Sequence, residues 1–590
     1  MNQRKTFTTF HLWRRKHIAN KQWIMLLSIA VGFTSGISAV IMKNLVHWVQ
    51  SLLTHSIVIN YHNYLYFIYP IIGILLTVLF LKVFLKKKLG HGIPSTLYAI
   101  STKNSIIQRF NMYASIVTSV LTVGFGGSVG LEGPAVSTAS AIGSNLGRIG
   151  RVNYKATTLL LGCGAAGAMA GIFNAPIAAI VFALEVIMLD LTAGSLIPLL
   201  LASVSAALTS RFIAGDAVLF NVEITELFTL NDTLFYVLLG IFSGLVSVYF
   251  SKVYWIVEAR FAKINNAYTR LLIGGSILGF LIFLIPPLYG EGFATINELL
   301  AGNYQEIFNG SILYEYRENI LVAISLLFVM MLFKAVATSV TFGAGGIGGI
   351  FAPSLFLGAT AGFVFAKAIN YFNFFHVSEK NFILVGMAGI LAGVLHAPLT
   401  ALFLIAEITA SYDLIIPLMV TAAISFLTAK YFVPHSLYTM QLAKRGELIT
   451  HDKDKAVLTL MKLSSEIETE FKVIHPEDSL GQLVKVVAKS TRNIFPVTDE
   501  KNQLIGIVTL DDIRKIMFDA SQYDQLFVSD FMSDYPDCVS SSDTMDSVMQ
   551  KFQRSGAWNL PVIDDGNYIG FVSKSKLFNA YRKILMDFSE

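Results

Sequence analysis

The sequence predicts an α-helical, multi-pass membrane protein with a cytoplasmic α/β part at its C-terminal end. Of the 590 residues, 54% are hydrophobic and only 14% are charged, whereas soluble proteins carry about a quarter charged residues. Apolar stretches of membrane-spanning length recur along most of the chain. Charged residues then become frequent near residue 445, so we place a membrane part at 23–445 and a soluble part at 446–590.

The apolar stretches are the expected membrane segments. A spanning helix needs about 20 apolar residues, and some of the stretches are too short or too interrupted by Gly and Pro to be single spans. They lie at 23–42, 64–85, 113–123, 157–187, 195–213, 234–256, 271–288, 319–342, 354–372, 382–406 and 414–433.

Residues 1–22 are basic and polar, and no small-residue cleavage site follows the first apolar stretch, so they do not resemble a cleavable signal peptide. Six Lys and Arg residues precede Trp23, which predicts a cytoplasmic N-terminus. The soluble part at 446–590 is expected on the same side.

The membrane part contains an internal repeat. The segment AGIFNAPIAAIVFALE (170–185) matches AGVLHAPLTALFLIAE (392–407), and GSVGLEGP (127–134) matches GIGGIFAP (346–353), with offsets of 222 and 219 residues. These pairs place two repeats at about 30–215 and 234–433. Duplicated apolar segments interrupted by Gly and Pro are typical of transporters and channels in which broken helices meet near the midplane.

Each glycine-rich motif of the second pair predicts a loop that opens a helix, at Pro134 in one repeat and at Pro353 in the other. Glycine lets the backbone turn and approach an ion closely. Helix N-termini carry unpaired N–H groups and partial positive charge, so several that face one point would bind an anion.

Glu132 is a carboxylate at membrane depth among these N–H groups. When ionised it would occupy the anion site, and when protonated or displaced it would leave the site open. Since ionisable residues within the membrane are usually functional, Glu132 is a candidate gate and proton carrier. The alternative is a Glu that only caps its own helix. The equivalent position in the second repeat is Phe351, so the duplicated scaffold does not require a carboxylate there.

The soluble part also repeats. RNIFPVTDEKNQLIGIVTLDDI (492–513) parallels AWNLPVIDDGNYIGFVSKSKL (557–577), and a helical pattern precedes each. The pattern predicts two β–α–β–β–α modules at about 465–520 and 528–585.

These motifs together resemble the CLC family of chloride channels and chloride/proton exchangers, and 446–590 resembles a pair of CBS domains. The resemblance implies an inverted-repeat membrane fold, a homodimer with one pore per subunit, and chloride as the transported ion. The motifs that carry it are GHGIP (90–94), GLEGP (130–134), GIFNAPIAAIVFALE (171–185), GGIFAP (348–353), HAPLTALFLIAE (396–407) and SLYTMQLAKRG (436–446).

Carried over by position, the resemblance assigns roles to individual residues. Glu132 matches the external gating glutamate, and Tyr438 matches the tyrosine whose hydroxyl faces the central anion. An interfacial aromatic anchor is the alternative for Tyr438. The backbone N–H groups of Ile350 and Phe351 match the central donors, and Gly130 and Gly349 belong to the same anion-binding loops.

The chain departs from the family pattern at His91, where a serine is usual. A histidine there could bind the anion, alter selectivity or make transport pH-sensitive. Equally, its ring could point away while a backbone N–H serves the ion.

A second departure is Val186, which directly follows Glu185 where exchangers often carry an internal proton-transfer glutamate. Valine cannot relay a proton, so we expect a passive, gated chloride channel, with a proton-coupled chloride/proton antiporter as the alternative. Glu185 has a counterpart in Glu407, which indicates a structural hydrogen bond rather than transport.

The CBS pair suggests an adenine nucleotide site at Thr509 and Asp512. In the second copy Ser573 matches the pattern, but Lys576 replaces the aspartate, so at most one standard site is expected. A purely structural dimerisation module is the alternative.

Other classes fit the residues less well. A CBS-bearing magnesium channel would need pore carboxylates or carbonyls for a hard cation, and the membrane part supplies few such carboxylates. A metalloprotease would need HExxH, but none of the eleven histidines is followed by Glu. We therefore expect no enzyme, no metal site, no required cofactor and no nucleic-acid partner; the expected partners are a small anion, the lipid bilayer and a second copy of the chain.

Overall fold

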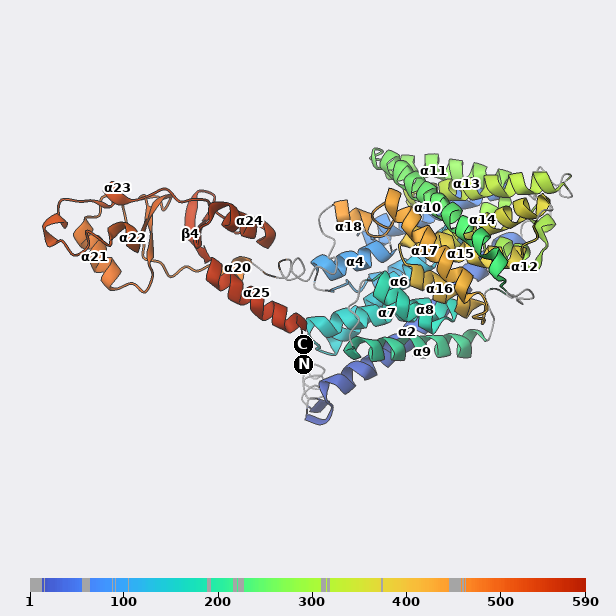
Figure 1. Ribbon diagram of the computed structural model, residues 1–590, viewed down its shortest axis with the longest axis horizontal. Coiled ribbons are helices and arrows are strands. Elements are labelled where there is room, and N and C mark those ends of the chain that lie inside the picture. Colours follow the sequence, from blue (N-terminus) through green and yellow to red (C-terminus); the bar gives the residue numbers. More distant parts are fainter. Residues whose placement is uncertain are drawn as a thin grey trace. The chain divides into compact units, whose positions relative to one another are not determined.

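The computed structural model describes residues 13–14, 16–55, 64–87, 89–90, 92–103, 105–187, 193–215, 220, 228–308, 315, 319–372, 375–444, 458, 461 and 463–589. The chain forms two compact units, residues 1–448 and 449–590. The first unit is helical and the second mixes short helices with strands (Figure 1).

The membrane unit consists of two successive sets of helices. The first set is α2 (Asn20–His55), α3 (Tyr64–Leu79), α4 (Gly92–Thr102), α5 (Asn111–Gly124), α6 (Glu132–Ile149), α7 (Tyr154–Phe173), α8 (Pro176–Glu185) and α9 (Ala193–Ala214). The second is α10 (Thr233–Ala262), α11 (Ala267–Leu284), α12 (Phe293–Ala301), α13 (Ile320–Ala344), α14 (Phe351–Tyr371), α15 (Glu379–Leu395), α16 (Pro398–Ile408) and α17 (Ile415–Phe432), followed by α18 (Met440–Lys444). A π-helical segment, Phe80–Leu85, extends α3.

The two sets pack in the same way. Helices α2, α7 and α9 contact one another, and so do their repeat equivalents α10, α15 and α17 (Figure 1). Likewise α6 packs on α7, α14 packs on α15, and α8 meets α16. The repeat seen in the sequence is therefore a repeat of tertiary packing.

Close approach of the central helices depends on equivalent glycines. A Cβ on Gly143 of α6 would collide with the backbone of Leu160 in α7, and a Cβ on Gly362 of α14 would collide with the backbone of Phe382 in α15. Both glycines are separated by the same 219 residues as the glycine-rich loops, so the tight crossing of the two helix pairs is duplicated as well.

Two of the expected apolar stretches are broken helices. The stretch 157–187 divides into α7 and α8, and 382–406 divides into α15 and α16. At each break the helix ends on a left-handed residue, Asn174 (φ 58°) or His396 (φ 57°), and the next helix begins at a proline. These two residues are therefore helix C-caps through their left-handed backbone.

Helix α6 was not among the expected apolar stretches, because it is rich in Gly, Ser and Ala. It is nevertheless almost wholly buried, since neighbouring helices rather than lipid surround it. Within the described residues, nine helices are long and apolar enough to cross a membrane.

The soluble unit contains two similar modules. The first has α21 (Leu480–Ala488), β1 (Ile494–Thr498), β2 (Leu504–Thr509) and α22 (Leu510–Ile513); the second has α24 (Met545–Ser555), β3 (Asn559–Asp564), β4 (Asn567–Ser573) and α25 (Lys574–Ser589). Short helices α20 (Leu463–Glu466) and α23 (Val528–Phe531) precede them.

Each module has an antiparallel strand pair with its hydrophobic side chains in register. Phe495 lies opposite Val508 in the first, and Leu560 lies opposite Val572 in the second. The expected first strand of each module is reduced to one parallel bridge, at Ile474 or Val539. The order of elements is otherwise the predicted one.

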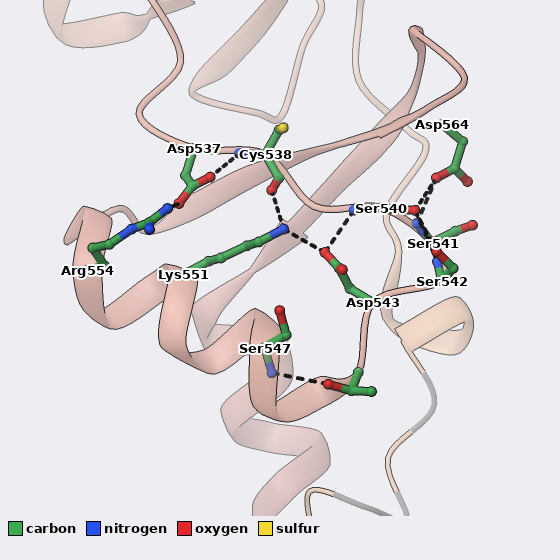
Figure 2. Close-up of polar contacts among 11 residues, drawn as sticks. Asp537, Cys538, Ser540, Ser541, Ser542, Asp543, Ser547, Lys551, Arg554 and Asp564 are labelled. Carbon is green, nitrogen blue, oxygen red and sulfur yellow. Dashed lines mark hydrogen bonds and ion pairs between the residues drawn. The ribbon is translucent and has the colours of Figure 1, made fainter. Parts of the chain in front are cut away.

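A set of polar contacts fixes the loop before α24 (Figure 2). The Lys551 ammonium donates to the Cys538 carbonyl at 2.9 Å and to Asp543 at 2.7 Å, and Arg554 pairs with Asp537 at 2.6 Å. These contacts attach the exposed start of the second module to its own helix.

Candidate functional site

The starts of α6 and α14 are joined directly. The Gly130 N–H donates to the Gly349 carbonyl at 2.9 Å, and the Gly349 N–H donates to the Gly130 carbonyl at 2.7 Å. This reciprocal, antiparallel pair connects equivalent loops of the two repeats, as a two-fold relation between them requires. A Cβ on Gly349 would lie 2.7 Å from the Gly133 nitrogen, so glycine is needed for the approach.

The reciprocal pair changes the role expected for these two glycines. Each N–H donates to the carbonyl of the other glycine, so neither donates to an anion in this structure. Instead they hold the two helix starts together. The helices begin at Glu132 and Phe351, two residues before the expected prolines, and their first N–H groups have no partner within the helix.

A pocket of about 30 Å³ lies beside these helix starts. That volume suffices for one small ion or water molecule. None of its lining side chains is formally charged. The lining comes from the beginnings of α4 and α6, the loop before α14, the segment before α18, and helices α10 and α13. The lining residues are Gly92, Ile93, Pro94, Gly133, Tyr254, Phe342, Gly348, Gly349, Ile350, Leu437 and Tyr438.

Tyr438 lies in this pocket as expected from its match to the family. The residue is 5% exposed, and its hydroxyl has no hydrogen-bond partner among the described residues. A buried hydroxyl without a partner costs free energy. An anion in the pocket would accept its hydrogen bond.

Glu132 is fully buried at the first position of α6. Within the described part of the chain neither carboxylate oxygen has a hydrogen-bond partner, although the Glu132 and Ala352 amides lie nearby. Its side chain folds back over Gly130, where an added Cβ would strike the carboxylate. Glu132 and the Tyr438 hydroxyl are close enough to interact electrostatically. The carboxylate is therefore beside the pocket and is not held there by strong bonds.

His91, the third side chain assigned to the anion site, lies outside the described residues. Its neighbour Gly92 begins α4 and lines the pocket.

Glu185 and Glu407 form reciprocal helix caps. The Glu407 carboxylate accepts from the Ile177 and Ala178 N–H groups at 3.0 and 2.7 Å. The Glu185 carboxylate accepts from the Leu399 and Thr400 N–H groups at 3.1 and 2.7 Å, and from the Thr400 hydroxyl. Each repeat thus caps a helix of the other.

The capped geometry agrees with a structural role for Glu185. Val186, the position without a carboxylate, ends α8 and is 4% exposed. Its N–H bonds to Phe182, and its side chain adds no ionisable group.

Two charged residues were not predicted from the sequence: Glu291, which lies beside Glu132, and Lys334, which lies beside Glu291. The Glu291 carboxylate accepts from the Leu131 N–H at 3.2 Å and acts electrostatically on Glu132. Lys334 of α13 is fully buried and donates to the Gly290 carbonyl at 2.9 Å. A single lysine inside the apolar stretch 319–342 was the available signal, because charged residues at membrane depth are rarely incidental.

In the soluble unit, Thr509 and Asp512 bond to each other. The Asp512 carboxylate accepts from the N–H and the hydroxyl of Thr509, both at 2.7 Å. In the second module the Ser573 hydroxyl donates to Glu468 at 2.8 Å, and Arg492 pairs with the same carboxylate at 2.6 Å. The Glu468 carboxylate therefore already bonds to Ser573 and Arg492. No cluster of three potential metal ligands occurs in the described residues.

Helices broken at equivalent positions, paired helix starts and an uncharged buried pocket define a duplicated membrane transporter for an anion. Residues 72–430 match the family model described as voltage gated chloride channel, and residues 465–519 and 528–583 match CBS domains. The chain therefore belongs to the voltage gated chloride channel family, the CLC family, and carries two CBS domains. As a member of this family, its membrane unit transports anions.

Known proteins resemble the chain over most of their own length. A protein of Ralstonia nicotianae named as a ClcB-like chloride channel protein is 29% identical over 64% of this chain and 85% of its own. The H(+)/Cl(-) exchange transporter ClcA of Yersinia pestis is 27% identical over 71% of this chain and 87% of its own. The crystal structure of a slow cyanobacterial Cl-/H+ antiporter aligns with a TM-score of 0.61 at 23% identity, covering 72% of this chain and 98% of that one.

Proposed function

We propose that the protein exchanges chloride for protons across the membrane, with Glu132 as both gate and proton carrier. The observation that carries the proposal is the state of Glu132. It is fully buried beside the pocket, and neither of its oxygens has a partner among the described residues. An ionised carboxylate there competes with the anion for helix N-termini, whereas a protonated one does not.

The relatives support exchange better than the passive channel that we expected from the sequence. The Yersinia pestis relative is named as an H(+)/Cl(-) exchange transporter, as are several others of similar identity. Val186 favours a channel, because no carboxylate stands at the usual internal position. In an exchanger, the protons must reach Glu132 by another route.

The remaining assignments belong to the same proposal. The pocket beside Tyr438 and Ile350 holds the central chloride. The chain works as a homodimer in the bilayer, with both termini in the cytoplasm. Thr509 and Asp512 form the one site in the CBS pair that suits an adenine nucleotide, and no cofactor is needed for transport itself.

The test is the reversal potential of the purified protein in a planar bilayer, under a chloride gradient with and without a proton gradient. An exchanger gives a potential that moves with the proton gradient. A potential that stays at chloride equilibrium would establish the channel instead.

The variant Glu132→Gln tests the gate. We expect a large anion flux that no longer depends on pH and no longer moves protons, because the amide resembles the protonated carboxyl and cannot ionise. Loss of all flux in a folded protein would remove Glu132 from the gate.

A further inference from the structure

We propose that Glu291 is a positioning residue of the gate: it holds the first turn of α6, and its charge sets the pH range over which Glu132 responds. The inference rests on the proposed function of Glu132.

The loop around Glu291 aims it at the gate. Gly290 (φ +60°) and Gly292 (φ +89°) flank it in left-handed conformations, which glycine adopts without strain. The Glu291 carboxylate then accepts from the Leu131 N–H at 3.2 Å. Leu131 is the N-cap residue of α6 and directly precedes Glu132.

Other bonds fix this loop to the one that carries Glu132. The Ser128 hydroxyl donates to the Leu288 carbonyl at 2.7 Å, and the Tyr289 hydroxyl donates to the Gly124 carbonyl at 3.0 Å. From α13, Thr338 donates to the Ser128 carbonyl at 2.8 Å. Residues 288–291 and 124–131 thus form one bonded assembly.

Lys334 of α13 also contacts the Glu291 loop. Its ammonium donates to the Gly290 carbonyl at 2.9 Å and lies 4.9 Å from the centre of the Phe356 ring. The Phe356 ring would also clash with a Cβ on Gly292. Burial opposes ionisation of Glu291, whereas the fully buried Lys334 acts electrostatically on it and favours the ionised carboxylate.

A second carboxylate beside Glu132 has a direct consequence for the gate. Two neighbouring carboxylates resist carrying negative charge at the same time. Among the described residues, the charged and titratable groups that act on this pair are Tyr438 on Glu132, and Lys43 of α2 and Lys334 on Glu291. With Glu291 ionised, Glu132 gives up its proton only at higher pH.

The test compares chloride flux against pH in proteoliposomes for the parent, Glu291→Gln and Glu291→Met. Gln keeps an oxygen that accepts from Leu131 and removes only the charge, whereas Met removes both. Folding of each variant is checked by size-exclusion chromatography and thermal unfolding. One folded variant is sufficient for the test. We expect the midpoint of the flux–pH curve to move to lower pH by about one unit. The matched control Glu298→Gln, in α12, should leave the curve in place.

A double-mutant cycle with Glu132→Gln identifies the route of the effect. Adding Glu291→Gln to Glu132→Gln should cause no further change in pH dependence, because the group that responds is already neutral. Other titratable residues, such as His91, contribute equally to the pH dependence of the single and the double variant.

The outcomes separate the two proposals. A parent protein without chloride flux, or with a pH dependence that survives Glu132→Gln unchanged, refutes the proposed function. A parent whose pH dependence requires Glu132, together with an unmoved midpoint in folded Glu291→Gln, refutes only the role of Glu291.

Discussion

At the residue scale, the site is built from polar groups that the fold leaves without partners. Glu132 and the Tyr438 hydroxyl are both buried, and neither has a hydrogen-bond partner in the described part of the chain. Folded proteins seldom leave such groups unsatisfied unless a ligand or a reaction uses them. Their proximity to one small pocket is what makes them functional candidates.

The variant Tyr438→Phe removes the hydroxyl and little else. A hydrogen bond to a charged group contributes about 1.5–3 kcal/mol, so chloride binding measured by calorimetry should weaken by about tenfold or more. Thermal stability should not fall, since the hydroxyl has no partner in the protein. The control Tyr249→Phe deletes a hydroxyl that donates to the Leu332 carbonyl at 3.1 Å; it should lower stability and leave chloride affinity unchanged. The reverse pattern would make Tyr438 a structural residue.

At the scale of elements, α8 and α16 are each capped by the other repeat. This arrangement predicts a stability role for Glu185 and Glu407. Replacing either by Ala leaves two N–H groups at a helix start without their acceptor, at a cost of about 1–2 kcal/mol. Thermal unfolding in detergent should show a similar loss for both variants. The chloride-to-proton ratio should stay at the parent value, and a changed ratio in Glu185→Ala would give that residue a part in transport.

The sequence predicted these elements unevenly. The breaks at Asn174 and His396 were marked by Ala-Pro directly after them, and the helix starts at Glu132 and Phe351 by Gly and Pro. Helix α6 was not predicted, because it is buried by contacts with α5 and α7. The hydropathy of a single segment does not report such contacts. The Glu291–Leu131 contact spans 160 residues, and its loop, YGEGF, reads as an ordinary polar turn. Tyr438 was assigned to the anion site by the resemblance to the CLC family. The residue type alone would not have done so, because a tyrosine also fits a membrane interface.

At the scale of the whole molecule, both units have apolar cores and carboxylates that bind polar partners. In the soluble unit some of these carboxylates also pair with charged side chains. Burial alone would raise the pKa of Glu468, but hydrogen bonds from Ser573 and Arg492 outweigh it, so that its pKa is lowered. The pKa of Asp537 is lowered in the same way: burial opposes the shift, and the bonds from Arg554 and the Cys538 N–H, together with the charges of Arg554 and Lys551, outweigh it.

These shifts predict acid sensitivity of the soluble unit. A carboxylate with a lowered pKa in the folded state stabilises that state above the pKa of the unfolded chain, about 4, and this stabilisation is lost as the pH falls through the folded-state value. We therefore expect hydrogen exchange in 463–589 of the full-length protein to accelerate below about pH 4, before exchange in the membrane helices does. Glu468→Gln should destabilise the unit at pH 7 and have a smaller effect at pH 3. An equal effect at both pH values would contradict the assignment.

The reciprocal bonds between Gly130 and Gly349 also have a mechanical consequence. Many duplicated transporters expose their substrate alternately by rocking one half against the other. Here the hinge of such a motion would pass through the two helix starts that form the ion site. Every transport cycle would have to break both backbone bonds and separate the caps at Glu185 and Glu407. The two repeats are thus bonded to each other at the place where a rocking transporter would have to separate them. We therefore expect the access route to change by the swing of a side chain, while the backbone frame around the ion stays still.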